Sequence, residues 1–246
     1  MDGGSPCQRL DWDTDFFGFP IARALGRRLD EPTADAIDAW CETQGIRCLY
    51  FLADSDDPET ARIASERGFR HVDDRIRMVH SLADLDGAGA PAEIRDARPD
   101  DVDRLAEIAA VSHKDSRFFA DPGFPRDRCA EMYERWVADA VTDLLRPVRV
   151  PVIDGRVVGY QVISPPDQNR IGRLEILAID EEARGAGIAS QLLLHSLDWC
   201  AEQGAASVVT ITQGRNTASI EAHRRVGFSD EIDGVWHHRW YDAHGG

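Results

Sequence analysis

The chain has 246 residues and a formal net charge of −16 at pH 7. A field of that sign repels nucleic acid and anionic lipid, so we expect neither a nucleic acid nor a membrane as a partner. No stretch approaches the roughly 18 consecutive apolar residues of a membrane-spanning helix, and the N-terminus lacks the basic and apolar regions of a secretory signal.

One break in the sequence divides the chain. Residues 86–92 are small and show no periodicity, which is typical of a linker. We therefore expect two domains, residues 1–85 and residues 93–246.

Strand-like and helix-like segments alternate in the second part. The spacing of apolar residues predicts a strand (93–98), two helices (100–111 and 127–145) and a hairpin (148–153 with 157–163). A strand (174–179), a helix (185–203), a strand (207–212) and a helix (216–226) follow, and residues 228–241 form one or two final strands. Asp154-Gly155 has the composition of a two-residue hairpin turn. Together these segments predict an α/β fold with a sheet of mixed direction.

The first part repeats landmarks of the second at a constant offset of 159 residues. Trp40-Cys41-x-x-Gln44-Gly45 returns as Trp199-Cys200-x-x-Gln203-Gly204, and Gly68-Phe69 returns as Gly227-Phe228. We interpret residues 1–85 as a degenerate copy of the second part. Because this copy has no glycine-rich loop, we expect it to shape the acceptor cleft rather than to bind a cofactor.

The segment Arg184-Gly185-Ala186-Gly187-Ile188-Ala189 lies between a predicted strand and a predicted helix. Glycines at such a turn bring backbone N–H groups close to a ligand, and a helix N-terminus favours anions. The segment therefore predicts a pyrophosphate site, with Arg184 adding a charged contact. It fits neither the dinucleotide-binding pattern, because Ser190 stands where a third glycine is needed, nor the P-loop pattern, which needs Gly-Lys-Ser/Thr. A plain glycine-rich turn is the structural alternative.

Three landmarks in order resemble the GNAT (GCN5-related) N-acetyltransferase superfamily: the Arg184–Ala189 loop, Asn216 at the start of the next helix, and Gly227-Phe228 beyond it. The resemblance implies a mixed, mostly antiparallel sheet with a central splay that holds acetyl-CoA between strands 174–179 and 207–212. It implies that the backbone of Leu177 and Ile179 pairs with pantetheine and that an N–H near Leu177–Ala178 stabilises the oxyanion. The implied cofactor-binding residues are Leu177, Ala178, Ile179, Arg184, Gly185, Ala186, Gly187, Ile188, Ala189 and Asn216.

Shorter segments are similar to the bacterial dTDP-fucosamine acetyltransferase group: residues 10–18, Asp115-Ser116-Arg117-Phe118 and Tyr133-x-x-Trp136. This similarity implies acetylation of the 4-amino group of a dTDP-4-amino-4,6-dideoxy sugar. Arg117 suits a phosphate and Phe118 can stack on thymine; the alternative is a buried arginine and a core phenylalanine. A polyamine, amino acid or antibiotic amine as acceptor, or a non-catalytic acetyl-CoA-binding module, also remains open.

The resemblance places His223 where the superfamily often has a tyrosine that protonates the leaving thiolate. Histidine has a reference pKa near 6.5, and we expect Arg224 and Arg225 to lower it further. Glu175 is the candidate general base, because the period of two along a strand places it on the face of Leu177; a solvated carboxylate is the alternative. Tyr241 is a weaker candidate donor. Glu182 departs from the superfamily pattern, since a carboxylate near a pyrophosphate is unfavourable.

No metal site is expected. The five cysteines are odd in number and no pair has CxxC spacing, which favours a reduced, cytoplasmic protein. His237 and His238 are adjacent on a predicted strand and so point to opposite faces. The sequence leaves the oligomeric state open, a homodimer included.

Overall fold

The computed structural model describes residues 4–84 and 93–241. The described chain divides into two compact units. Unit 1 contains residues 4–75, 116–125 and 232–241, and unit 2 contains residues 76–84, 93–115 and 126–231. The predicted linker, residues 86–92, lies outside the described residues.

Unit 2 carries the elements predicted for residues 93–226. Its strands are β5 (Glu93–Asp96), β6 (Val148–Ile153), β7 (Arg156–Val157), β8 (Gly159–Ser164), β9 (Ile171–Ile179) and β10 (Ser207–Gln213), joined by part of β4 (Arg70–Ser81). Its helices are α4 (Val102–Ser112), α6 (Arg126–Thr142), α7 (Ile188–Glu202) and α8 (Thr217–Arg225), with short 3₁₀ turns at Leu82–Asp84, Pro99–Asp101 and Glu181–Ala183.

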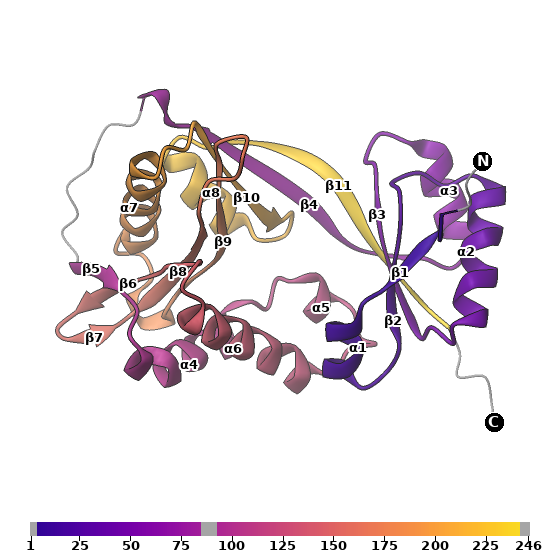
Figure 1. Ribbon diagram of the computed structural model, residues 1–246, viewed down its shortest axis with the longest axis horizontal. Helices are drawn as coiled ribbons and strands as arrows, with labels where there is room; N and C mark the ends of the chain where they lie inside the picture. Colours follow the sequence, from indigo (N-terminus) through magenta and orange to yellow (C-terminus); the bar gives the residue numbers. More distant parts are fainter. Residues whose placement is uncertain (1–3, 85–92, 242–246) are drawn as a thin grey trace. The chain divides into compact units, whose positions relative to one another are not determined.

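The sheet of unit 2 has the order β4-β10-β9-β8-β6-β5, with β7 paired to β6. Strands β9 and β10 are parallel, whereas the β9–β8, β8–β6 and β6–β5 pairs are antiparallel. Figure 1 shows α7 on one side of β8 and β9 and α4 with α6 on the other. Buried Leu193, Leu197 and Cys200 follow helical spacing on α7 and pack against the sheet. The predicted α/β fold with a mixed sheet is confirmed.

Unit 1 has a smaller sheet. Its elements are β1 (Cys7–Arg9), α1 (Asp11–Phe17), β2 (Ile21–Ala24), α2 (Glu31–Thr43), β3 (Cys48–Ala53), α3 (Pro58–Glu66) and α5 (Arg117–Ala120), with most of β11 (Ser229–Trp240). The order is β1-β2-β3-β11, in which only β2 and β3 are parallel. Ile37, Phe51 and Ile63 form part of its buried core.

The repeated landmarks fall at equivalent places in two copies of one helix–strand–helix–strand segment, α2-β3-α3-β4 and α7-β10-α8-β11. Gly45 and Gly204 end the first helix of each copy with φ of +61° and +85°, and Gly68 and Gly227 end the second with +77° and +95°.

The last strands of the two copies complete each other's sheets. Strand β11, which follows α8 along the chain, pairs with β3 of unit 1, and β4, which follows α3, pairs with β10 of unit 2. The compact units therefore have different bounds from the expected domains 1–85 and 93–246, since a C-terminal strand completes the first unit.

Several predicted segments have different ends in the structure; for example, the predicted helix 127–145 ends at Thr142 and the predicted strand 174–179 begins at Ile171. The predicted helix 185–203 begins at Ile188, because Gly185 and Gly187 have positive φ angles that a helix does not allow. Residues 228–241 form one strand, β11. Among the described residues no helix is long and apolar enough to cross a membrane.

Candidate functional site

A cavity of about 400 Å³ lies in unit 2 where β9 and β10 separate. The strands pair only along Ile171–Leu174 and Ser207–Thr210, although β9 continues to Ile179. In the part of the chain that the structure describes, residues 175–179 therefore have no strand partner on the side of β10. This divergence is the splay that the resemblance to the GNAT superfamily implied.

The predicted cofactor-binding residues come together around this cavity. Leu177, Ala178, Ile179, Arg184, Gly185, Gly187, Ile188, Ala189 and Asn216 line it. Ala186 instead lines a neighbouring cavity of about 480 Å³, which shares Arg184 and Ile188 with the first.

A β-bulge interrupts β9 beside the cavity. Gln161 of β8 pairs with Leu177, but Ile163, two residues further on, pairs with Leu174, three residues back. Because Glu175 and Ile176 of β9 both oppose Val162 of β8, the alternation of faces is reset and Leu174 and Leu177 share a face. The Gln161 side chain supports the bulge, since its Nε2 donates to the Ile176 carbonyl at 3.2 Å.

Glu175 consequently does not share a face with Leu177, and the expectation based on a period of two is wrong on this point. The extra residue turns Glu175 toward α6, where it lines a separate cavity with Trp136. Its carboxylate accepts a hydrogen bond from Ser164 and lies 3.3 Å from Arg146 Nη1. Glu175 is thus a salt-bridged carboxylate outside the cavity of the splay.

The loop between β9 and α7 has the conformation that its glycines permit. Gly185 and Gly187 have φ angles of +81° and +77°. A Cβ atom at Gly185 would meet nothing within 4 Å, so backbone conformation and not crowding requires glycine there.

Helix α7 begins directly after this loop without a side-chain cap and without an acidic residue in its first turn. Among the described residues no side chain caps this end of the helix, so the N–H groups of residues 188–190 can bind an anion at the positive end of the helix dipole.

Basic side chains adjoin the loop. Arg184 and Arg225 both line the cavity, and Arg184 Nε donates to the Ile179 carbonyl at 3.1 Å. Glu182 pairs with Arg156, with 3.0 Å between Oε2 and Nη1, and lines only the neighbouring cavity. This ion pair explains how a carboxylate is tolerated in the loop.

Helix α8 directs residues other than the expected His223 to the cavity. Its N-cap Asn216 accepts a hydrogen bond from Ser219 N at 3.0 Å, so its side chain fixes the start of the helix. Ser219, Ala222 and Arg225 line the cavity from the same face of α8.

His223 is 3% exposed, and its ring packs edge-on against Phe228. Nδ1 lies 2.8 Å from the Ser219 carbonyl, to which it can only donate. Burial lowers the pKa of His223, and this hydrogen bond opposes the shift only in part. Burial, and not the expected influence of Arg224 and Arg225, is therefore the cause of the lowered pKa of His223. His223 is therefore neutral at pH 7, with its proton directed at the backbone.

Two polar residues that line the cavity were not predicted from the sequence as site residues. Ser112, at the end of α4, and Asp115, just beyond it, both line the cavity. Ser112 Oγ is buried without a hydrogen-bond partner among the described residues. Asp115 is the only carboxylate among the described residues that line this cavity. Asp115 belongs to the segment Asp115–Phe118, but no local sequence pattern marked it as a better candidate general base than Glu175.

Arg117 and Phe118 belong to unit 1. Arg117 is partly exposed, and its guanidinium carbon lies 4.3 to 4.4 Å from the ring centroids of Tyr50, Phe118 and Trp236. Phe118 is 3% exposed and packs against Phe17 and Tyr50. Its ring is therefore part of the core of unit 1, the alternative that the sequence had left open.

The candidate metal residues form no site in the described part of the chain, where no group of three metal-binding side chains occurs. His237 and His238 have different partners, as expected for neighbours on a strand: Nδ1 of His237 bonds the Val235 carbonyl and Nδ1 of His238 bonds Asp121. All five cysteines are free and buried.

The sequence matches a model of the acetyltransferase (GNAT) family over residues 111–228. It is 30% identical over 233 residues to a mycothiol acetyltransferase of Sanguibacter keddieii, covering 85% of this chain and 68% of the relative. It is 28% identical over 148 residues to the spore coat polysaccharide biosynthesis protein SpsD of Bacillus subtilis, covering 60% of this chain. The chain spans only 50% of the length of SpsD.

Two solved structures share the fold. A GCN5-related N-acetyltransferase from Sphaerobacter thermophilus has a TM-score of 0.66 at 16% identity, covering 95% of this chain and 76% of that chain. A tandem GNAT protein from the clavulanic acid biosynthesis pathway has a TM-score of 0.59 at 16% identity, covering 91% and 76%. At such low identity these likenesses carry the fold alone.

Proposed function

This chain belongs to the GNAT acetyltransferase family, and from that premise we propose that it transfers an acetyl group from acetyl-CoA to the primary amine of a nucleotide-linked amino sugar. One observation carries the proposal: the splay of β9 and β10 opens beside a glycine loop and an uncapped helix N-terminus.

The residues of the cavity fit the parts of coenzyme A. The N–H groups at the start of α7 suit the pyrophosphate, and Gly185 and Gly187 allow the backbone to approach it. The unpaired edge of residues 175–179 offers backbone hydrogen bonds to an amide-containing chain such as pantetheine. Acetyl-CoA supplies an activated acetyl group, and the same edge supplies N–H groups where negative charge develops on the thioester oxygen.

The proton of the acceptor amine needs a base, because only a neutral amine is nucleophilic. We assign this role to Asp115, the carboxylate of the cavity, in place of Glu175. His223 is poorly suited to donate a proton to the leaving thiolate, since it is neutral and its N–H is held by the Ser219 carbonyl.

The acceptor is inferred from several partial similarities. Segments of the sequence are similar to the dTDP-fucosamine acetyltransferase group, and SpsD is named for polysaccharide biosynthesis. The partly exposed cation at Arg117 suits an acidic acceptor. The match to mycothiol acetyltransferase extends over more of the chain and favours the acceptor of mycothiol acetylation as the second candidate.

The decisive experiment measures thiol release from acetyl-CoA with a panel of amines that includes dTDP-4-amino-4,6-dideoxy sugars, amino sugars, polyamines and amino acids. We expect the nucleotide sugar to give the highest kcat/KM. Release with a small amine but with no nucleotide sugar would refute the acceptor, and release with no amine would refute the transferase proposal.

A further inference from the structure

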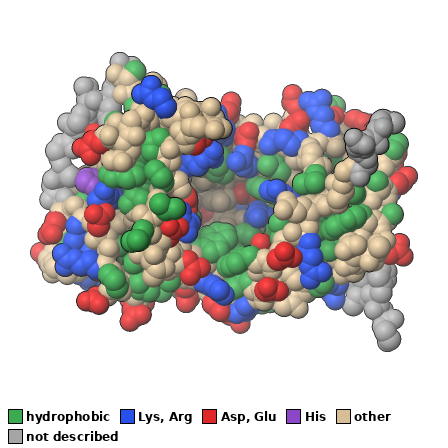
Figure 2. Space-filling model, viewed as in Figure 1, with side chains coloured by type: hydrophobic (Ala, Val, Ile, Leu, Met, Phe, Trp, Pro, Cys, Tyr) green, Lys and Arg blue, Asp and Glu red, His purple; other side chains and the backbone are tan. Residues whose placement is uncertain are grey.

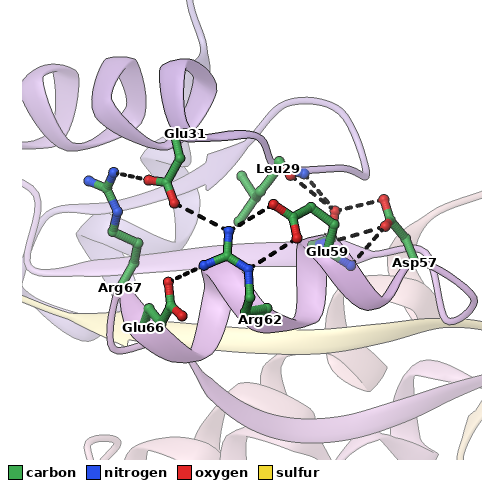
Figure 3. A network of polar contacts seen from close by, with 8 residues as sticks. Leu29, Glu31, Asp57, Glu59, Arg62, Glu66 and Arg67 are labelled. Carbon is green, nitrogen blue, oxygen red and sulfur yellow. Dashed lines mark hydrogen bonds and ion pairs between the residues drawn. The ribbon is translucent and has the colours of Figure 1, made fainter.

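Most arginines on the surface of unit 1 meet carboxylates. On α3, Arg62 lies 2.7 Å from Glu59 and also pairs with Glu66, and Arg67 Nη2 lies 2.6 Å from Glu31 (Figure 3). Acidic and basic side chains are likewise intermixed on the face shown in Figure 2. This pairing is expected in a chain with net charge −16.

Arg117 differs from these arginines. Within residues 4–84 and 93–241, its guanidinium has one hydrogen bond to protein, from Nη1 to His238 Nε2 at 3.0 Å, and no carboxylate within 4 Å. Asp13 attracts it only from a longer distance, and burial raises the pKa of Asp13. Three aromatic rings surround the cation, which removes part of its water.

His238 directs the guanidinium. His238 is 0% exposed and its Nδ1 lies 2.7 Å from Asp121 Oδ2, while Asp121 itself is 1% exposed. Burial lowers the pKa of His238 to about 4, so the ring is neutral, Nδ1 donates to Asp121 and Nε2 accepts from Arg117.

Asp121 is fixed in turn. Its carboxylate also accepts hydrogen bonds from Trp240 Nε1 at 2.8 Å and from Gly123 N at 2.9 Å. The chain Asp121–His238–Arg117 therefore ends in a cation of fixed orientation, most of whose N–H groups remain without a protein acceptor among the described residues.

This arrangement is costly as a purely structural element. A partly desolvated charge whose nearest counter-ion, Asp13, is not in direct contact is unfavourable, and an apolar side chain of similar length would pack among the rings without that cost. An oxyanion bound at the planar fork of the guanidinium would restore the missing partner with two charge-assisted hydrogen bonds.

We propose that unit 1 contains an oxyanion site centred on Arg117, framed by Tyr50, Phe118 and Trp236 and oriented by His238 and Asp121, which takes the phosphate or carboxylate group of a small-molecule ligand. The identification of this ligand with the acceptor rests on the proposed function. Arg117 contacts the anion directly, and His238 and Asp121 are positioning residues.

The test uses the full chain with the Gly185 loop saturated by coenzyme A, so that probes report on a different site. Calorimetry measures the binding of thymidine diphosphate, of malonate as a carboxylate probe, and of uncharged thymidine. We expect thymidine diphosphate to bind, and Arg117→Met to weaken its binding at least 30-fold while leaving coenzyme A affinity unchanged. Arg23→Met, at an exposed arginine of β2, is the matched control and should change neither affinity. Stronger binding of malonate than of thymidine diphosphate would identify a carboxylate acceptor.

Variants of His238 separate positioning from packing. Gln can place an oxygen where Nε2 accepts from Arg117, whereas Phe cannot. We therefore expect His238→Gln to stay within threefold of the wild type for thymidine diphosphate and His238→Phe to weaken it about tenfold. Equal affinities in Gln and Phe variants that still bind coenzyme A would overturn the positioning role.

The outcomes distinguish this inference from the proposed function. If the wild type binds neither anionic probe, or if Arg117→Met and Arg117→Lys bind them as well as the wild type does, Arg117 is a packing residue and the inference is overturned, whatever the thiol-release assay shows. If no amine promotes thiol release but Arg117→Met still loses the probe, the site stands and the transferase proposal fails.

Discussion

The Gly185 loop of unit 2 and the Arg117 site of unit 1 are both arranged to hold anions, but they are built differently. The loop uses backbone N–H groups from one continuous segment, and its requirement is two glycines with positive φ and an uncapped helix. The Arg117 site uses a side chain that is oriented by residues from two distant segments of the chain. The first design is encoded locally and does not titrate. The second depends on tertiary structure and on the protonation of His238.

The largest expected effect is at the loop. In Gly185→Asp, a residue that tolerates positive φ places a carboxylate beside the pyrophosphate, where like charges about 4 Å apart repel by several kcal/mol. We expect the Kd for acetyl-CoA, measured by calorimetry, to rise roughly 100-fold, which corresponds to about 2.7 kcal/mol. Gly204→Asp is the control, because Gly204 has a similar φ of +85° at the opposite end of α7. Equal losses in the two variants would mean that strain, and not charge at the loop, weakens binding.

Lowering the pH should reduce the stability of the fold through His238 of the Arg117 site, whereas the backbone N–H groups of the Gly185 loop do not titrate. The folded pKa of His238, about 4, lies below the value of about 6.5 expected in the unfolded chain, so the unfolded chain binds more protons. Stability from this group is complete above pH 6.5 and is lost as the pH falls toward 4. Between pH 7 and pH 5 we expect the free energy of unfolding in urea to fall by about 2 kcal/mol more in the wild type than in His238→Gln.

His113 provides the comparison within unit 2. Burial lowers its pKa to about 4 as well, but its side chain is partly exposed, so we expect a smaller contribution. If His238→Gln retains the full pH dependence of the wild type, His238 is not held neutral by the fold.

The next effect concerns Asp115. Asp115→Asn keeps the shape of the side chain but cannot accept the amine proton. We expect kcat/KM for the acceptor to fall about tenfold, less than the roughly 100-fold or more usual for a general base, because Asp115 is exposed and water can take over part of its role. The loss should narrow as the pH is raised, because a larger fraction of the acceptor amine is then neutral without help. Asp103→Asn, at the exposed first turn of α4, is the control. An unchanged kcat/KM in Asp115→Asn with unchanged acetyl-CoA affinity would remove Asp115 from the reaction.

The sequence predicted what is encoded locally. The order of elements, the hairpin at Asp154-Gly155 and the glycine loop were predictable because periodicity, turn chemistry and positive φ are properties of short segments. The orientation of Glu175 was not predictable, because the bulge exists only in the pairing of β9 with β8. The bounds of the units were not predictable either, because β11 completes a sheet whose other strands lie nearly 200 residues earlier in the chain. His238 gains its partners Arg117 and Asp121 only through tertiary structure, and Asp115 lines the cavity only in the folded chain.

The smallest expected effect is at His223, where the superfamily pattern and the structure differ. A tyrosine at this position would have a hydroxyl that can protonate the leaving thiolate, whereas the neutral His223 donates its N–H to the Ser219 carbonyl. We therefore expect His223→Phe to change kcat less than threefold and to lower stability by about 1 kcal/mol, the usual worth of one hydrogen bond. His223→Tyr is the variant matched to His223→Phe, since tyrosine has nearly the shape of phenylalanine with a hydroxyl added. Equal kcat in the two variants, measured by thiol release at saturating acetyl-CoA, would show that this position of α8 serves packing. A Tyr variant that is at least tenfold faster than the Phe variant would show that a proton donor at this position can still reach the reacting sulfur, and would return His223 to the list of catalytic candidates.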